Sequence, residues 1–490
     1  MNFIDKDLVS IQESRILMEE AKEAKNSLAV FPQSKLDEVL ECMYQAISPR
    51  ITEIACLSVE ETGYGCREDE SAQLKLLLEY LMKKLKDMLC VGILKDDREE
   101  KTMDVGIPLG IVTVFLPSVN PVPAVISSAF LCVKTGNAVV FSPSVRAQKT
   151  VRKTVDILAK AAALAGIPQG SISCLKTVAN EGSKAMLTHP DVSIVLNIGR
   201  KDIMSSALLG KPVIYGGTGP SPVFIERTAD IERAVKDIMM SRSFNCGILP
   251  ASEQYVVADS LIATQVKQEM KNNGAYFLNE QEEERLIGFL CPGNHEMDVE
   301  YIGKPAAWLA KKAGFYVPET TSVLVSEKGY IPDCNPYAKE LRCPILAFYI
   351  EQDWMYACER CMNLLVHESR GHSLVIHSKD EEVIRQFILK KPVARVLVNT
   401  PAAFGAMGLC TNLFPAAALG GLTAGMGITA DNLSPMHLIY IRKAGYGVRT
   451  GEELLQIQEN SINRPRHNSM EEEPKKVLEQ ILLKLLNEIQ

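Results

Sequence analysis

Residues Gly110–Ser142 read GIVTVFLPSVNPVPAVISSAFLCVKTGNAVVFS, and this stretch decides the fold. Gly110–Leu116 is rich in β-branched residues and predicts a buried strand, followed by a proline-rich turn at Pro117–Pro123. Ala124–Val133 predicts a buried helix, and Ala138–Ser142 predicts a second strand. Strand, turn, helix and strand in this order are typical of a parallel α/β unit.

The same alternation continues on both sides of this stretch. A good helix is predicted at Gln148–Ala165 and another at Asp202–Leu209. Further strands are predicted at Ile172–Leu175, Val192–Leu196, Val213–Tyr215, Tyr255–Ala258, Ser322–Val325, Ile345–Ile350, Leu374–His377 and Arg395–Val398. Repeated β-loop-α units of this spacing predict a doubly wound parallel sheet, and the second set of units, after Glu226, predicts a second α/β domain.

The two ends of the chain differ from this pattern. Met1–Asp97 is predicted to be mainly helical, because apolar residues recur at helical spacing. Met436–Arg442 and Lys101–Gly106 are predicted strands that could build a sheet shared between subunits. Residues 458–474 are polar and predict a disordered linker, and Lys475–Gln490 predicts an amphipathic helix. Such a short helix is marginal alone, so it docks either on its own protein or on a partner.

Composition excludes several classes of protein. A length of 490 residues predicts about two or three domains, and the mild net charge of −7 argues against a nucleic-acid partner. The apolar run Asp104–Lys134 is interrupted by four prolines, which favours buried structure over a membrane span. Thirteen scattered cysteines and no apolar signal core in Met1–Glu13 predict a cytoplasmic protein with reduced thiols. Cys358 and Cys361 form a lone C-x-x-C in a predicted helix, which favours packing over metal binding.

The segment Ser243–Gln254 reads SFNCGILPASEQ and follows a predicted helix, Ile231–Ser241. A cysteine in a small-residue turn after a helix is a place where a fold can hold a thiolate against a substrate. This segment resembles the active-site segment of CoA-acylating aldehyde dehydrogenases, in which the nucleophilic cysteine directly precedes Ala-Ser-Glu-Gln. Here that position is Pro250. Cys246 lies four residues earlier, so it can be the displaced nucleophile only if the turn is redrawn around Pro250.

The resemblance extends to other motifs and implies further site residues. Pro117-Ser118-Val119-Asn120-Pro121 is similar to a family turn in which the asparagine amide stabilises an oxyanion, so Asn120 is implied in that role. A capping role for Asn120 is the alternative. Ser142 and Pro143 would line the adenosine pocket of NAD, and Gly199 would place its pyrophosphate at a helix N-terminus. Arg200 stands where the family has a small residue, and it would either pair with a phosphate or block the site.

Three more positions are implied by the family match. Gly217, in the loop Gly216–Ser221, and Glu340, near the nicotinamide ribose, are implied cofactor residues, although Glu340 could equally be a surface carboxylate. His372, in a Gly-His-Ser turn, is a candidate for orienting CoA or moving a proton. The C-terminal stretches Thr429–Met436 and Ile441–Arg449 are close matches to the family's signature.

The resemblance therefore implies an α/β aldehyde dehydrogenase-like fold: a Rossmann-type NAD-binding domain with a helical lead-in (residues 1–225), a catalytic domain (226–430) and a small oligomerisation sheet (431–457). It implies an NAD-dependent enzyme, with NADP not excluded, that converts a short-chain aldehyde and CoA to acyl-CoA through a cysteine thioester. No metal is required. The alternative is a catalytically inactive homologue with a structural or regulatory role, because Pro250 replaces the cysteine.

Assembly and location are also implied by resemblance. The expected oligomer is a homodimer or a tetramer. The helix Lys475–Gln490 resembles encapsulation peptides, which implies binding to a shell protein of a bacterial microcompartment in the cytoplasm.

Overall fold

The computed structural model describes residues 5–200, 210–217, 219–290, 297–332, 336–366, 372–421, 428–455 and 472–487. The predicted helix at Asp202–Leu209 and most of the predicted linker lie outside these residues. The chain divides into two compact units. One comprises Met1–Leu94 and Gly106–Arg442, and the other comprises Lys95–Val105 and Lys443–Gln490.

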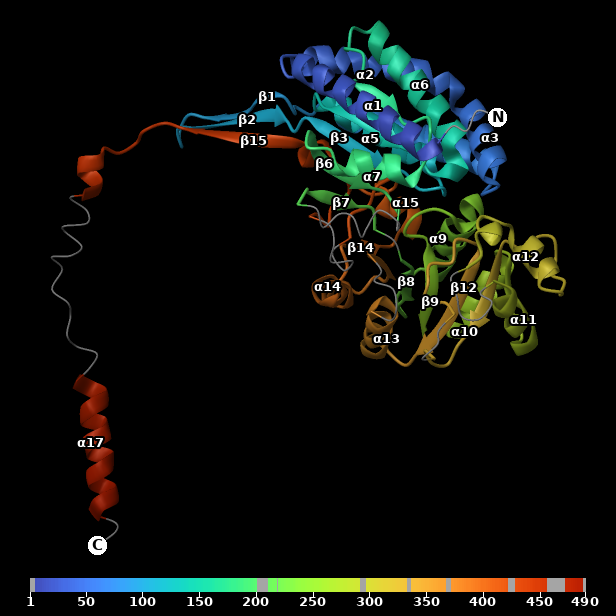
Figure 1. Ribbon diagram of the computed structural model, residues 1–490. Coiled ribbons are helices and arrows are strands. Elements are labelled where there is room, and N and C mark those ends of the chain that lie inside the picture. Colours follow the sequence, from blue (N-terminus) through green and yellow to red (C-terminus); the bar gives the residue numbers. More distant parts are fainter. Residues whose placement is uncertain are drawn as a thin grey trace. The chain divides into compact units, whose positions relative to one another are not determined.

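The first unit begins with the predicted helical lead-in. Its helices are α1 (Lys6–Leu28), α2 (Gln33–Ile47), α3 (Ile51–Thr62) and α4 (Arg67–Lys86). The apolar stripes read from the sequence are the buried faces of α1 and α2, which confirms that prediction. In Figure 1 these helices are drawn in blue; α1 packs against strand β4 (Ala138–Ser142), whereas α2 and α4 pack against helix α5 (Pro121–Lys134).

The first sheet has five parallel strands in the order β5-β4-β3-β6-β7. They are β3 (Ile111–Phe115), β4 (Ala138–Ser142), β5 (Ile172–Cys174), β6 (Val192–Asn197) and β7 (Val213–Tyr215). The connecting helices are α5 (Pro121–Lys134), α6 (Gln148–Leu164) and α7 (Asn180–Thr188), and every residue of α5 is buried. The prediction of a strand, a turn and a buried helix in place of a membrane span is thus confirmed. Within the described residues, no helix is long and apolar enough to cross a membrane.

The second sheet has seven parallel strands in the order β10-β11-β12-β9-β8-β13-β14. They are β8 (Ser221–Ile225), β9 (Glu253–Asp259), β10 (Ala275–Phe277), β11 (Val323–Glu327), β12 (Ile345–Glu351), β13 (Ser373–His377) and β14 (Arg395–Val398). The helices around it are α9 (Ile231–Ser243), α10 (Ala263–Asn272), α11 (Glu280–Leu290), α12 (Ala306–Lys312), α13 (Trp354–Val366), α14 (Glu381–Lys390) and α15 (Ala402–Ala406).

Strand β8 was not predicted, and it matters for the domain boundary. A boundary at residue 225 assigns β8 to the first domain, but the strand pairs with β9 and β13 in the second sheet. The chain therefore crosses to the second sheet at Ser221, directly after the Gly216–Pro220 loop.

A third sheet joins β1 (Gly92–Asp97), β2 (Thr102–Pro108) and β15 (Ile439–Gly445) in the order β1-β2-β15. The predicted strands at Lys101–Gly106 and Met436–Arg442 thus lie in one sheet, while β1 was not predicted. In the second unit, Lys443 pairs with Asp104 at 2.7 Å. The predicted C-terminal helix is present as α17 (Glu472–Asn487), and Leu478, Ile481 and Leu482 are all exposed on it.

Candidate active site

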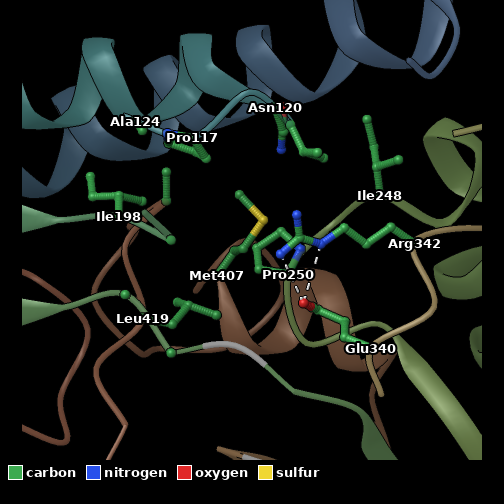
Figure 2. A pocket seen from close by; sticks show the side chains of 15 residues that line it. Pro117, Asn120, Ala124, Ile198, Ile248, Pro250, Glu340, Arg342, Met407 and Leu419 are labelled. Atoms are coloured by element: carbon green, nitrogen blue, oxygen red, sulfur yellow. Dashed lines mark hydrogen bonds and ion pairs between the residues drawn. The ribbon is translucent and has the colours of Figure 1, made fainter. Parts of the chain in front are cut away.

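A cavity opens where the strand order of the first sheet reverses, between β3 and β6. The chain leaves β3 toward β4 on one side, and β6 continues toward β7 on the other. Crevices at the carboxyl ends of strands at such a switch point are the usual ligand sites of doubly wound sheets. The cavity measures ≈ 80 Å³ and is lined by residues from α5 and from segments that connect the strands and helices of both sheets: Pro117, Val119, Asn120, Ala124, Ile198, Gly199, Gly216, Gly217, Ile248, Pro250, Glu340, Arg342, Met407, Ala417 and Leu419 (Figure 2).

Asn120 lies at the cavity wall in a strained backbone conformation. It precedes α5 with φ 51° and ψ 52°, and its side chain makes no capping hydrogen bond, so the capping alternative is not what the structure contains. Its Oδ1 is buried and has no partner among the described residues. In Figure 2 the amide nitrogen of Asn120 points into the cavity. A left-handed asparagine whose amide is free to donate fits an oxyanion-binding role.

Pro250 lies in the same cavity, but Cys246 is not among the lining residues. Cys246 and Asn245 adopt left-handed conformations, with φ 54° and 49°, just before Gly247. The Asn245 amide N–H donates to Asp69 Oδ2 at 2.7 Å, and its side-chain Oδ1 accepts from the Cys66 amide at 2.7 Å. The turn is thus tied to the start of α4, and the structure does not bring the Cys246 thiol together with Asn120.

The glycines implied by the sequence form one wall of the cavity. Gly199 has φ +80°, which favours glycine, and Gly217 has no room for a side chain. A Cβ on Gly217 would lie 2.8 Å from His372 Cδ2 and 3.0 Å from the Leu419 carbonyl oxygen. Glycine at position 217 therefore lets the backbone pack closely against His372 and Leu419.

Ser142, Pro143 and Arg200 lie at the end of β4 and just after β6. The Ser142 side chain is buried, and its hydroxyl bonds that of Ser183 at 2.9 Å, so it faces α7 and not an open pocket. Arg200 Nη1 donates to the Pro143 carbonyl at 3.3 Å. The structure therefore brings Arg200 and Pro143 together at the predicted adenosine side of the site.

His372 is buried behind Gly217 and has a defined tautomer. Arg395 Nη1 lies 3.0 Å from its Nδ1, and the Ser373 hydroxyl lies 2.8 Å from the same atom. Because a guanidinium only donates, Nδ1 accepts and the hydrogen is on Nε2, which has no partner among the described residues. Burial and the Arg395 charge lower the pKa of His372 to about 3. The ring is thus neutral at physiological pH and offers a donor, which does not fit the predicted alternative of moving a proton. Gly371 lies outside the described residues.

Glu340 and Arg342 form the opposite wall. Glu340 Oε2 accepts from Arg342 Nε and Nη2 at 3.2 and 3.1 Å, so the carboxylate is not the solvated surface group that was the alternative. In Figure 2 the Arg342 guanidinium and the Met407 side chain reach toward the middle of the cavity. Sequence reasoning missed Arg342 and Met407 as site residues. Arg342 lies two residues after Glu340, which the family match implied, so its position in the sequence could have indicated it. No feature of the sequence indicated that Met407 lines the site.

One group of potential metal ligands occurs among the described residues, away from this cavity. Glu19, His189 and Asp191 place ligand atoms within 4.8 Å of one another. Lys22 already pairs with Asp191 at 3.1 Å.

Glu253, in the Ala-Ser-Glu-Gln segment, gives a prediction for stability. Its carboxyl group is fully buried, and Oε1 accepts from the Ala402 amide at 2.7 Å. Burial raises its pKa from 4.5 to about 7. The carboxyl group keeps its proton to a higher pH in the folded protein than in the unfolded chain. Its contribution to the free energy of unfolding is therefore fully present below about pH 4.5 and is lost as the pH rises through about 7. We expect the free energy of unfolding of the wild-type protein to fall by about 3 kcal/mol between about pH 4.5 and pH 8 because of this group alone.

Glu253→Gln removes this titration. Urea titrations measure the free energy of unfolding of both proteins. From about pH 5 to pH 8, the wild-type protein should lose about 3 kcal/mol more of this free energy than the Gln variant does. Glu232→Gln, at an exposed side chain of α9, is the control and should show no such trend. A gap for Glu253→Gln that is equal at both pH values would contradict the raised pKa.

Comparisons with known proteins bear on this site. The sequence matches the aldehyde dehydrogenase family over residues 10–280. It is 32% identical over 438 residues to the bifunctional aldehyde-alcohol dehydrogenase AdhE of Escherichia coli (strain K12), covering 88% of this chain and 49% of AdhE. The chain thus spans about half the length of this curated relative.

Solved structures match over nearly the whole chain. A probable aldehyde dehydrogenase from Listeria monocytogenes EGD-e has 40% identity and a TM-score of 0.89, covering 92% of this chain and 100% of the other. An acetylating aldehyde dehydrogenase from Geobacillus thermoglucosidasius has 35% identity and a TM-score of 0.88, with coverage of 91% and 99%. A propionaldehyde dehydrogenase from the fucose utilisation microcompartment of Clostridium phytofermentans shares the fold at 24% identity and a TM-score of 0.79, with coverage of 88% and 97%.

Proposed function

The chain belongs to the aldehyde dehydrogenase family, and from that premise we propose that it is a CoA-acylating enzyme that oxidises a short-chain aldehyde. The observation that carries the proposal is the cavity at the switch point, where the Asn120 amide faces Glu340 and Arg342 across a small space. An amide aimed into the cavity can bind the carbonyl oxygen and stabilise the negative charge that develops on it.

The residues present fit a nicotinamide cofactor, NAD in our proposal. Gly199 follows β6 with φ +80°, and Gly217, after β7, lines the same cavity. Glu340 would contact the nicotinamide end, and Pro143 and Arg200 the adenosine end. The cofactor, when bound, supplies the acceptor for the hydride of the aldehyde oxidation. CoA is the proposed co-substrate, and His372 is the proposed donor toward it.

The inactive alternative, which Pro250 suggested, is not favoured. A buried polar atom without a partner costs about 1–3 kcal/mol. Asn120 Oδ1 is such an atom among the described residues and lies at the wall of the cavity, which supports a ligand-binding site there.

The test is the rate of NADH formation by the full chain with acetaldehyde or propionaldehyde, NAD or NADP, and CoA. We expect NADH formation that requires both the aldehyde and CoA. A rate that is unchanged when CoA is omitted, or no NADH under any of these conditions, would overturn the proposed activity.

We propose how the protein assembles and where it is located from two elements near the C-terminus, β15 and α17. The exposed apolar residues of α17, among them Leu478 and Ile481, support docking on a microcompartment shell protein in the cytoplasm. The mostly exposed strand β15 supports pairing between subunits in a homodimer or tetramer. Removal of residues 475–490 should abolish co-sedimentation with shell protein and leave the rate of NADH formation unchanged. Co-sedimentation of the truncated chain would contradict the docking role.

A further inference from the structure

A second pocket of the first unit lies apart from the candidate active site. It measures ≈ 420 Å³, and its described lining residues include none of those that line the active-site cavity. The end of α3, the turn after β4 and the stretch from α11 to α12 form it. Two hydrogen bonds join the end of α3 to this stretch: Lys304 Nζ donates to the Gly63 carbonyl at 2.6 Å, and the Gly65 amide donates to the Gly303 carbonyl at 3.1 Å. The pocket is therefore held between segments that are far apart in sequence.

Aromatic side chains form one part of the surface of this pocket. Phe289, Tyr301 and Trp308 line it, and each is half-buried. The ring centroids of Phe289 and Tyr301 lie 4.2 Å apart, and those of Tyr301 and Trp308 lie 6.3 Å apart. The three rings thus form a continuous surface on which a flat ring of a ligand can stack.

Cationic side chains line the same pocket. They are Arg146, Lys304 and Lys312. Glu300 is the one carboxylate among the described lining residues. Lys304 Nζ and Lys312 Nζ lie 6.0 and 5.4 Å from the centroid of the Trp308 ring, so the indole holds two ammonium groups at the pocket in spite of their mutual repulsion. Positive charge beside the rings favours an anionic ligand.

Rings and cations together narrow the chemistry of the ligand. An inorganic anion would make no use of the aromatic surface, and an uncharged ring would make no use of the cations. A nucleoside phosphate uses both, because its base stacks on aromatic side chains and its phosphate accepts hydrogen bonds from arginine and lysine. The volume of ≈ 420 Å³ also suits such a ligand, since pockets for small organic molecules measure about 300–1,000 Å³.

We infer that this pocket binds a nucleoside phosphate, with the base on the rings of Phe289, Tyr301 and Trp308 and the phosphate at Arg146 and Lys312. Such binding needs no reaction in the active-site cavity, so it stands apart from the proposed function. A free mononucleotide and the nucleotide part of CoA share this chemistry. AMP and CoA are therefore both used as probes.

The first measurement is a calorimetric titration of the wild-type full chain with AMP, with adenosine and with inorganic phosphate. We expect AMP to bind at least about tenfold more tightly than either of the others, because only AMP engages the rings and the cations together. The unfolding temperature should rise with the concentration of AMP, since AMP binds the folded chain. Displacement of bound AMP by CoA would identify CoA as a source of the nucleotide, and no displacement would identify a free nucleotide; either result supports the site.

Tryptophan fluorescence shows where AMP binds. The chain has two tryptophans, and the second of them, Trp354, lies on α13 and is not among the described lining residues. Trp354→Phe leaves Trp308 as the only indole, and a stacked base should quench its fluorescence. We expect saturable quenching by AMP, with the dissociation constant that calorimetry gives for the wild-type protein.

Charge-removing variants test the role of the cations. Lys312→Gln and Arg146→Gln should each weaken AMP binding at least about tenfold, because each removes a charged donor to the phosphate. Both side chains are exposed, and thermal unfolding checks that each variant is folded. Lys312→Arg keeps the charge and should bind AMP like wild type. Lys311→Gln, at the exposed neighbour on α12 that is not among the described lining residues, is the matched control and should also bind like wild type.

Three results would overturn the inference. One is no saturable binding of AMP to the wild-type protein. Another is binding of adenosine or of phosphate that is as tight as that of AMP, since either the cations or the rings would then contribute nothing. The third is AMP binding that neither Lys312→Gln nor Arg146→Gln weakens, or that leaves the Trp308 fluorescence unchanged. If Arg200→Gln weakens AMP binding in that case, AMP occupies the proposed adenosine end of the active site instead.

Discussion

Replacing Asn120 with alanine is expected to lower kcat about 10²- to 10³-fold, with a much smaller change in KM. The Asn120 amide faces the cavity, and its donor acts mainly on the charge that develops on the oxygen during reaction. Removing an interaction that is made only in the transition state reduces kcat and kcat/KM together. The measurement is the steady-state rate of NADH formation with saturating aldehyde, cofactor and CoA.

A second substitution separates the lost donor from backbone strain. Asn120 has φ 51°, where alanine is strained and glycine is not. Asn120→Gly should therefore lose as much kcat as Asn120→Ala but keep its thermal stability. Loss of activity in the alanine variant only, or a kcat within about threefold of wild type in both, would contradict the oxyanion role.

Arg242→Met is expected to lower the free energy of unfolding by about 2–6 kcal/mol, from about 1–3 kcal/mol for each of two buried carbonyls that lose their donor. Arg242 lies on α9 and is 2% exposed. Its guanidinium donates to the Leu341 carbonyl at 2.7 Å and, through Nε, to the Ile345 carbonyl at 3.0 Å. Methionine fills part of the space but leaves two carbonyls without their donor in the core. Because these bonds hold the segment that carries Arg342, kcat/KM should fall as well.

Urea unfolding of the full chain measures this loss. The control is Arg152→Met, where the side chain is half exposed and the ion pair with Asp156 spans 4.0 Å. That change should cost less than about 0.5 kcal/mol. A cost below about 1 kcal/mol for Arg242→Met would mean that the buried guanidinium does not fix the cavity wall.

Much of the fold could be predicted because local signals were strong. The strand Ala138–Ser142 has the predicted bounds, and α6 ends one residue before the predicted end, since Gly166 and Pro168 mark its close. Strand β8 was missed because Ser221–Ile225 follows a glycine-rich loop and contains Pro222, both of which are typical of loops. Its place in the second sheet depends on pairing with β9, which no local pattern reveals.

The site was predictable to the same degree. Asn120, Gly199, Gly217 and Glu340 do lie around one cavity, although their roles there remain proposals. Met407 enters it from a part of the chain far away in sequence, so no spacing could have indicated it. The position of the Cys246 thiol depends on two consecutive left-handed residues and on contacts with α4, and the sequence specifies neither. The hypothesis that Cys246 replaces the missing cysteine could therefore be tested only by the backbone conformation of this turn.

The most direct test of the proposed function is the identity of the carbon product. Wild-type full chain is incubated with propionaldehyde, NAD and CoA, and the products are separated and identified by mass spectrometry. We expect propionyl-CoA in an amount equal to the NADH formed. Free propionate in place of the thioester, or NADH without propionyl-CoA, would contradict an acylating activity.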